Sequence, residues 1–93
     1  MADSPVRREV HYSGQVQGVG FRNTVRTIAD RHGVTGYVVN LPDGRVKLVA
    51  EGTPEQLTEF LADISNLLEQ YIRDTSIENL PPTGEFFRFD IVF

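Results

Sequence analysis

One stretch, VHYSGQVQGVGFRNTVRTIADRHG at residues 10–33, joins a strand pattern to a helix pattern through closely spaced glycines. At its start Val10 and Tyr12 alternate with polar residues, the period of two that predicts a half-buried strand over residues 6–16. Beyond the glycines the apolar residues recur at helical spacing. The face they form consists of Phe21, Val25, Ile28, Ala29 and His32. Gly33 then supplies a stop for this helix.

A hairpin and a second helix follow. The turn signal Pro42-Asp43-Gly44 lies between two runs rich in β-branched and aromatic residues, which predicts a hairpin. Its strands cover residues 36–41 and 45–51. Thr53 and Gln56 have the spacing of a capping box around a proline, so a helix is expected to begin there. An apolar stripe continues this helix to about Gln70.

The remaining residues are less regular. A short strand is expected around residues 73–78, and the extent of the second helix and of this strand is left open between residues 68 and 80. Apolar residues alternate with others from Phe87 to Phe93, which predicts a final strand. We expect the Phe86–Phe93 run to belong to the core.

The predicted order is strand, helix, strand, strand, helix, strand, strand. This order is typical of the α+β class, with a ferredoxin-like βαββαβ core and an additional C-terminal strand. In this sandwich, two helices cover one face of an antiparallel sheet. We expect residues 1–5 to form a flexible N-terminal tail and residues 6–93 a single domain, because 93 residues suit one domain.

The composition excludes several classes of function. The chain has no cysteine, so it has no disulfide, no thiolate zinc site and no cysteine nucleophile. The net charge of −4 argues against bulk nucleic-acid binding. No apolar run approaches the roughly 20 residues of a membrane span, and the first residues lack a signal peptide pattern. We therefore expect a cytoplasmic protein without a membrane partner, and a monomer, since no apolar stripe is left over.

The glycine-spaced segment at residues 14–22 is the candidate for chemistry. Glycines let successive N–H groups point at one centre, and the following helix N-terminus adds further donors and partial positive charge. Arg22 lies in the first turn of that helix and offers a planar fork of donors suited to phosphate oxygens. By pattern alone, a tight strand-to-helix turn with a solvated arginine remains open as the alternative.

Other polar residues have ordinary explanations. Asn40 ends a strand just before the hairpin turn, where asparagine is common, so its pattern alone leaves a functional role open. His11 falls on the polar face of the first strand and His32 at the end of a helix. No carboxylate pattern near either histidine suggests a metal site.

Two motifs resemble the signature of the acylphosphatase family. They are Gly-Gln-Val-Gln-Gly-Val-Gly-Phe-Arg at residues 14–22 and Gly-Tyr-Val-Val-Asn-Leu-Pro-Asp-Gly-Arg-Val at residues 36–46. The second follows the first at the family's spacing, and the chain's ending, Gly84-Glu85-Phe86 with Phe89-Asp90-Ile91, is similar too. The resemblance covers most of residues 6–54 and the last ten, and it implies the ferredoxin-like fold.

The resemblance also implies the activity and its residues. It implies a metal-independent hydrolase, without a cofactor, that cleaves the carboxyl–phosphate bond of small acyl phosphates; inorganic phosphate is then product or inhibitor. The family's catalytic arginine falls on Arg22, and the asparagine that positions the attacking water falls on Asn40. The phosphate-binding loop is carried onto the backbone amides of Gln15, Val16, Gln17, Gly18, Val19 and Gly20.

The sequence departs from the family at two places. Val39 stands where a basic residue is often found, and residues 67–77 lack the usual Gly-Pro, so we expect a longer second helix. In some relatives a terminal carboxylate reaches an arginine of the site, which would here be that of Phe93.

Two other functions stay open at this point. The amino-terminal domain of the hydrogenase maturation protein that uses carbamoyl phosphate carries a similar motif. A module that handles carbamoyl phosphate, or that binds phosphate without catalysis, is therefore the main alternative. A nucleic-acid-binding ferredoxin-like domain is the other, and the acidic balance opposes it.

Overall fold

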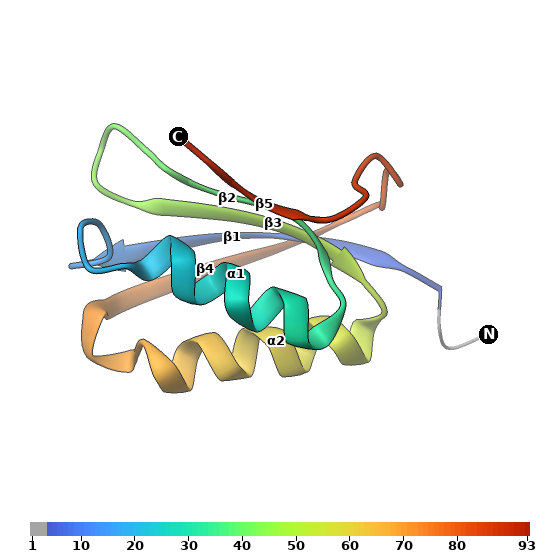
Figure 1. Ribbon diagram of the computed structural model, residues 1–93, viewed down its shortest axis with the longest axis horizontal. Coiled ribbons are helices and arrows are strands. Elements are labelled where there is room, and N and C mark those ends of the chain that lie inside the picture. The colour runs from blue at the N-terminus through green and yellow to red at the C-terminus, as the bar shows by residue number, and fades with distance from the viewer. Residues whose placement is uncertain (1–3) are drawn as a thin grey trace.

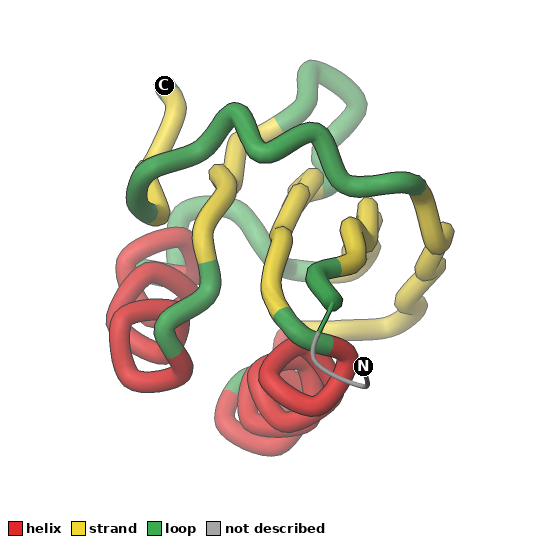
Figure 2. Tube along the Cα trace, turned by 90° about the vertical axis from the view of Figure 1, so that its right-hand side faces the viewer, coloured by secondary structure: helices red, strands yellow, loops and turns green. Residues whose placement is uncertain are grey.

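The computed structural model describes residues 4–93, which form two helices against one face of a five-stranded sheet (Figure 1). In chain order the elements are β1 (Val6–Gly14), α1 (Phe21–His32), β2 (Thr35–Asn40), β3 (Val46–Gly52), α2 (Pro54–Leu67), the short 3-10 helix η1 (Glu69–Tyr71), β4 (Ile72–Leu80) and β5 (Phe89–Val92). The strands are ordered β4-β1-β3-β2-β5. Figure 2 shows both helices on the same side of the sheet, so the expected α+β sandwich is confirmed.

The core lies between the sheet and the two helices. The helices bury the residues that the sequence pattern places on one face: Phe21, Val25, Ile28 and Ala29 from α1, and Leu57, Phe60, Leu61 and Ile64 from α2. The strands add Val10, Tyr12, Val38, Val46 and Leu48, all almost fully buried. Burying one large aliphatic or aromatic side chain contributes about 1.5–3 kcal/mol, so this shared layer supplies most of the driving force for folding.

Helix ends follow the local sequence. The Gln56 amide donates to Thr53 Oγ1 at 3.1 Å, and the Thr53 amide donates to Gln56 Oε1 at 2.9 Å, which completes the expected capping box. Helix α1 ends at Gly33, whose φ of 69° is left-handed, and the Gly33 N–H donates to the Ala29 carbonyl. Helix α2 ends at Leu67 and is followed by η1, so the prediction of a long second helix that continues to about Gln70 is wrong.

Strand β5 differs from the antiparallel arrangement that the sequence predicts. It pairs with β2 in parallel, with Gly36 opposite Phe89 and Val39 opposite Val92, and the sheet is therefore mixed. The physical reason is the path of the preceding segment, residues 81–88. Strand β4 ends beside Arg7, at the end of the sheet where β2 begins, and the segment crosses along that end (Figure 2). The chain can then return only in the direction of β2.

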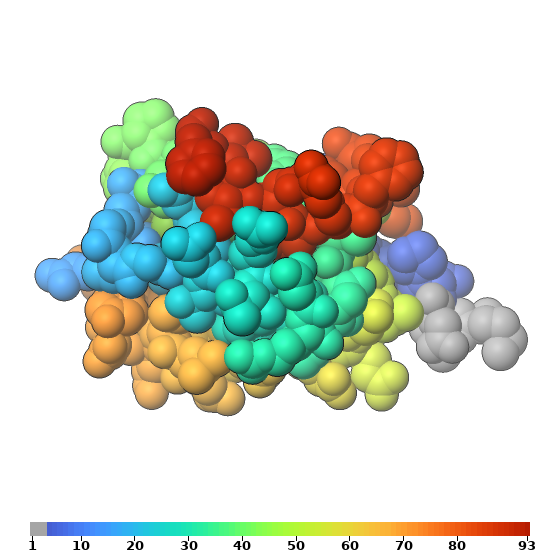
Figure 3. All heavy atoms as spheres, in the orientation of Figure 1, coloured from blue at the N-terminus to red at the C-terminus, as the bar shows by residue number. Residues whose placement is uncertain are grey.

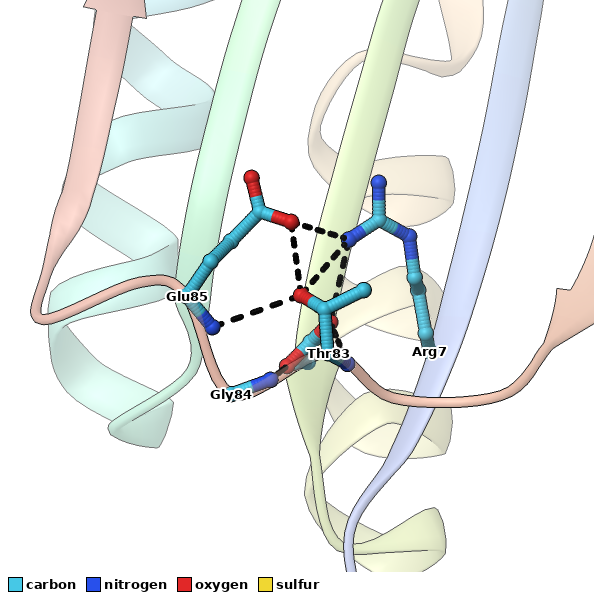
Figure 4. A network of polar contacts seen from close by, with 5 residues as sticks. Arg7, Thr83, Gly84 and Glu85 are labelled. Carbon is cyan, nitrogen blue, oxygen red and sulfur yellow. Dashed lines mark hydrogen bonds and ion pairs between the residues drawn. The ribbon is translucent and has the colours of Figure 1, made fainter.

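A buried carboxylate holds this crossover to the sheet (Figure 4). Glu51, on β3, accepts hydrogen bonds from the Thr83 amide at 2.9 Å, the Gly84 amide at 3.0 Å and Arg7 Nη1 at 3.0 Å. Burial by itself raises the pKa of the Glu51 carboxyl, but the hydrogen bonds from Thr83, Gly84 and Arg7 outweigh it, and the pKa lies below its ordinary value. The carboxylate therefore stays ionised in the folded protein at neutral pH.

Two local expectations need correction, and a third, the N-terminal tail, lies partly outside the described residues. Strand β4 runs over nine residues, Ile72–Leu80, and not only over 73–78. In the Phe86–Phe93 run only Phe89 is buried, while Phe87 is 98% and Phe93 96% exposed, because the short β5 alone lies against α1. Of the predicted tail, residues 1–3 lie outside the described part of the chain, and Ser4 and Pro5 have no regular secondary structure.

In the described residues, neither helix has the length and apolar character needed to cross a bilayer.

Candidate active site

A polar cleft of about 240 Å³ opens at the end of the sheet opposite the crossover. Three segments far apart in the sequence meet there: the loop after β1, the β2–β3 hairpin and the end of β5. Figure 3 shows them side by side as blue, green and dark red atoms at the same end of the molecule. The residues that line the cleft are Val16, Gly18, Gly20, Phe21, Arg22, Asn23, Asn40, Ile91 and Phe93.

The loop between β1 and α1 turns sharply at two glycines. Gly18 and Gly20 have φ angles of 80° and 76°, in the left-handed region that strains other residues. Gly20 directly precedes α1, no side chain among the described residues caps it, and the first turn of α1 carries no acidic residue. The unpaired N–H groups and the positive end of the helix dipole thus face the cleft without a competing negative charge. Such an end suits an anion.

The loop is tied to the hairpin by one side chain. Gln17 Nε2 donates to the carbonyl of Leu41 and to that of Arg45, both at 2.9 Å. The Leu41 amide also donates to the Arg45 carbonyl, which closes the hairpin turn. Both N–H groups of the Gln17 side-chain amide are therefore used, one on the residue that follows Asn40 and the other on the far strand of the hairpin.

Arg22 reaches the cleft from the first turn of α1. Its Nη1 donates to the Val92 carbonyl at 2.9 Å, and its guanidinium carbon lies 4.8 Å from the centre of the Phe93 ring. The end of β5 thus fixes one edge and one face of the guanidinium. An arginine has five N–H donors, so others are left for an oxyanion in the cleft.

Asn40 contributes to the cleft a side-chain oxygen that accepts no hydrogen bond from residues 4–93. It ends β2 opposite Val46, and its side chain lines the cleft. Asn40 Oδ1 is buried and has no hydrogen-bond partner among residues 4–93. Leaving a buried polar atom unpaired costs about 1–3 kcal/mol, so this oxygen is suited to accept a hydrogen bond from a molecule that enters the cleft.

The family model named Acylphosphatase matches residues 8–91. The chain belongs to the acylphosphatase family. A relative named acylphosphatase, from Lactobacillus johnsonii, is 40% identical over 83 residues, which are 87% of this chain and 91% of the relative. One from Marinobacter nauticus is 44% identical over 78 residues, 83% of this chain and 85% of the relative.

Solved structures agree with this assignment. The crystal structure of acylphosphatase from Bacillus subtilis superposes with a TM-score of 0.86 at 32% identity, over 95% of this chain and 99% of that chain. The fold is also part of a longer protein. Crystalline HypF from T. kodakarensis matches with a TM-score of 0.79 at 32% identity, over 95% of this chain but only 12% of its own.

The cleft of this family member gathers most of the residues that the sequence singles out. Arg22, Asn40, Val16, Gly18 and Gly20 line it together. Three other predicted loop residues lie differently. The Gln15 amide donates to the Tyr71 carbonyl at 2.9 Å and is not free for phosphate, while the side chains of Gln17 and Val19 do not line the cleft.

Sequence reasoning missed part of the site. It gave no role to Asn23 or Ile91, which line the cleft, and it expected the carboxylate of Phe93 to meet an arginine. The observed contacts of Arg22 are instead the Val92 carbonyl and the Phe93 ring. The period-two spacing of residues 89, 91 and 93 was the available signal, because it places all three on the face toward α1.

The histidines lie outside the cleft. His32 Nε2 is 2.7 Å from Asp63 Oδ2, which joins the end of α1 to α2, and His11 Nε2 is 4.0 Å from Glu9 Oε2 on β1. Among residues 4–93 no three His, Cys, Asp or Glu side chains are grouped so that they could hold a metal ion.

Proposed function

We propose that this chain is an acylphosphatase that hydrolyses small acyl phosphates to a carboxylate and inorganic phosphate. The observation that carries the proposal is the buried, unpartnered Oδ1 of Asn40 in the same cleft as Arg22 and a glycine loop. Family membership supports the same reaction. Such a hydrolysis requires donors that bind the phosphoryl group and a free acceptor that holds the attacking water.

The loop and Arg22 hold the phosphoryl group in this proposal. The backbone amides of residues 16–20 and the N-terminus of α1 donate to its oxygens, and Arg22 binds it with the N–H groups that Val92 does not use. These donors are fixed before the substrate arrives, so they stabilise the charge that develops on the phosphoryl oxygens in the transition state. Positive charge from Arg22 and the helix end makes a metal ion unnecessary.

Asn40 orients the attacking water. Its Oδ1 accepts a hydrogen bond from the water and turns the oxygen lone pair toward phosphorus. A bond forms between the water oxygen and phosphorus, the bond from phosphorus to the acyl oxygen breaks, and its electron pair leaves with the carboxylate. One water proton ends on a phosphate oxygen, so R–CO–O–PO₃²⁻ and H₂O give R–COO⁻ and H₂PO₄⁻. A carboxylate is a good leaving group and needs little help from an acid.

Hydrolysis of benzoyl phosphate by the purified chain in EDTA tests the proposal, with carbamoyl phosphate as a second substrate. We expect turnover of benzoyl phosphate well above the buffer rate, unchanged by EDTA and inhibited by inorganic phosphate. Loss of turnover in EDTA would contradict the metal-free mechanism. Turnover of carbamoyl phosphate alone would favour the carbamoyl-phosphate module that the sequence leaves open, and inertness toward both substrates would leave a phosphate-binding module.

A further inference from the structure

The carboxamide of Gln17 joins the two halves of the cleft. The glycine loop, which carries the phosphoryl-binding amides, and the hairpin, which carries Asn40, belong to different strands of the sheet. Within residues 4–93, the hydrogen bonds that connect this loop to this hairpin are the two from Gln17 to Leu41 and Arg45. Residues 15–20 have no regular secondary structure, so the ladder hydrogen bonds of the sheet do not fix their position.

The two acceptors of Gln17 lie where they affect Asn40 most directly. Leu41 directly follows Asn40 in the chain, so the first acceptor is the carbonyl of a residue covalently bonded to Asn40. Arg45 precedes Val46, which is the residue opposite Asn40 in the ladder. A displacement of the loop relative to these carbonyls is therefore a displacement relative to Asn40.

We propose that Gln17 is a positioning residue, whose side chain sets the distance between the bound phosphoryl group and the water held by Asn40. This inference rests on the proposed acylphosphatase function. The side chain does not line the cleft and touches neither reactant; it acts through the hairpin. A shift of about 1 Å between reacting groups can cost about 100-fold in rate, so even two exposed hydrogen bonds can matter for turnover.

The substitution Gln17→Met tests this role, because methionine has nearly the same length but no N–H donor. We expect kcat for benzoyl phosphate to fall about 10- to 100-fold, while the inhibition constant of inorganic phosphate stays close to that of the wild type. Phosphate contacts only the loop amides and Arg22, and those remain. Gln70→Met, the same change at an exposed glutamine of η1 that does not line the cleft, is the matched control and should leave both constants unchanged.

A double-mutant cycle with Asn40→Ala separates positioning from a general loss of structure. If Gln17 acts through Asn40, Gln17→Met lowers kcat in the wild-type background and has little further effect once Asn40 is gone. Equal fold losses in both backgrounds, or a parallel loss of phosphate affinity and of thermal stability, would overturn the proposal. An inert wild-type enzyme would instead overturn the proposed function, and with it this role.

Discussion

Arg22 shows how a single residue is prepared for an anion. A cation in the first turn of a helix is disfavoured by the helix dipole, by roughly 0.3–1 kcal/mol at an exposed site. The Val92 carbonyl and the Phe93 ring offset this cost, because the first accepts a hydrogen bond from Nη1 and the second lies against the guanidinium face. The arginine is thus held at the cleft by β5 before any ligand binds.

The substitution Arg22→Lys tests whether the fork of donors matters beyond its charge. Lysine keeps the charge but cannot bond Val92 and a phosphoryl group with fixed, planar geometry. We expect inorganic phosphate to bind about 10- to 100-fold more weakly, the equivalent of one lost charged hydrogen bond. Isothermal titration with phosphate measures this directly. Equal affinity in the two proteins would show that charge alone holds the anion.

At the scale of elements, the crossover from β4 to β5 depends on one carboxylate. Glu51 connects β3 with β1 through Arg7 and with the crossover through the amides of Thr83 and Gly84. Folding lowers the pKa of the Glu51 carboxyl. The ionised carboxylate therefore stabilises the fold fully at pH values above its pKa in the unfolded chain, about 4.3. That contribution is lost as the pH falls through the lower, folded value.

Replacing this carboxylate therefore changes both stability and its dependence on pH. We expect Glu51→Gln to lower the free energy of unfolding by about 1–3 kcal/mol at pH 7. The difference from the wild type should shrink as the pH falls below about 4, where the wild-type carboxylate is itself protonated. Urea denaturation at a series of pH values measures it.

Glu85→Gln is the matched control for this prediction. Glu85 belongs to the same cluster, but it is exposed and its oxygen lies 3.5 Å from Arg7 Nη1. Exposed pairs of this kind contribute little, so we expect a change below about 1 kcal/mol at every pH. A difference between Glu51→Gln and the wild type that persists unchanged in acid would contradict the assigned role of the ionised carboxylate.

Across the whole molecule, local signals predicted most of the elements. The change of hydrophobic period at Phe21, the capping box at Thr53 and the turn before Arg45 each arise from residues close in sequence, and the structure has the expected elements there. Local signals could not predict the direction of strand β5 in the sheet. Its parallel pairing depends on the path of the crossover and on a carboxylate of β3 that lies more than thirty residues earlier in the chain.

In the cleft, too, some residues are predicted by local motifs, while the contacts that position them come from residues far apart in the chain. Arg22 and the glycines lie within one motif, and the family resemblance names Asn40. The link through Gln17 and the contacts of Arg22 with Val92 and Phe93 join segments far apart in the chain, and no local pattern encodes them. The unpaired state of Asn40 Oδ1 is likewise a property of the packed molecule.

The most direct test of the account measures Asn40→Ala in two ways: kcat for benzoyl phosphate and the inhibition constant of inorganic phosphate. The loop and Arg22 bind the phosphoryl group, and Asn40 places the water. We therefore expect kcat to fall about 100-fold or more while phosphate inhibits the variant about as well as it inhibits the wild type. Unchanged turnover, or phosphate affinity lost together with turnover, would contradict this division of roles.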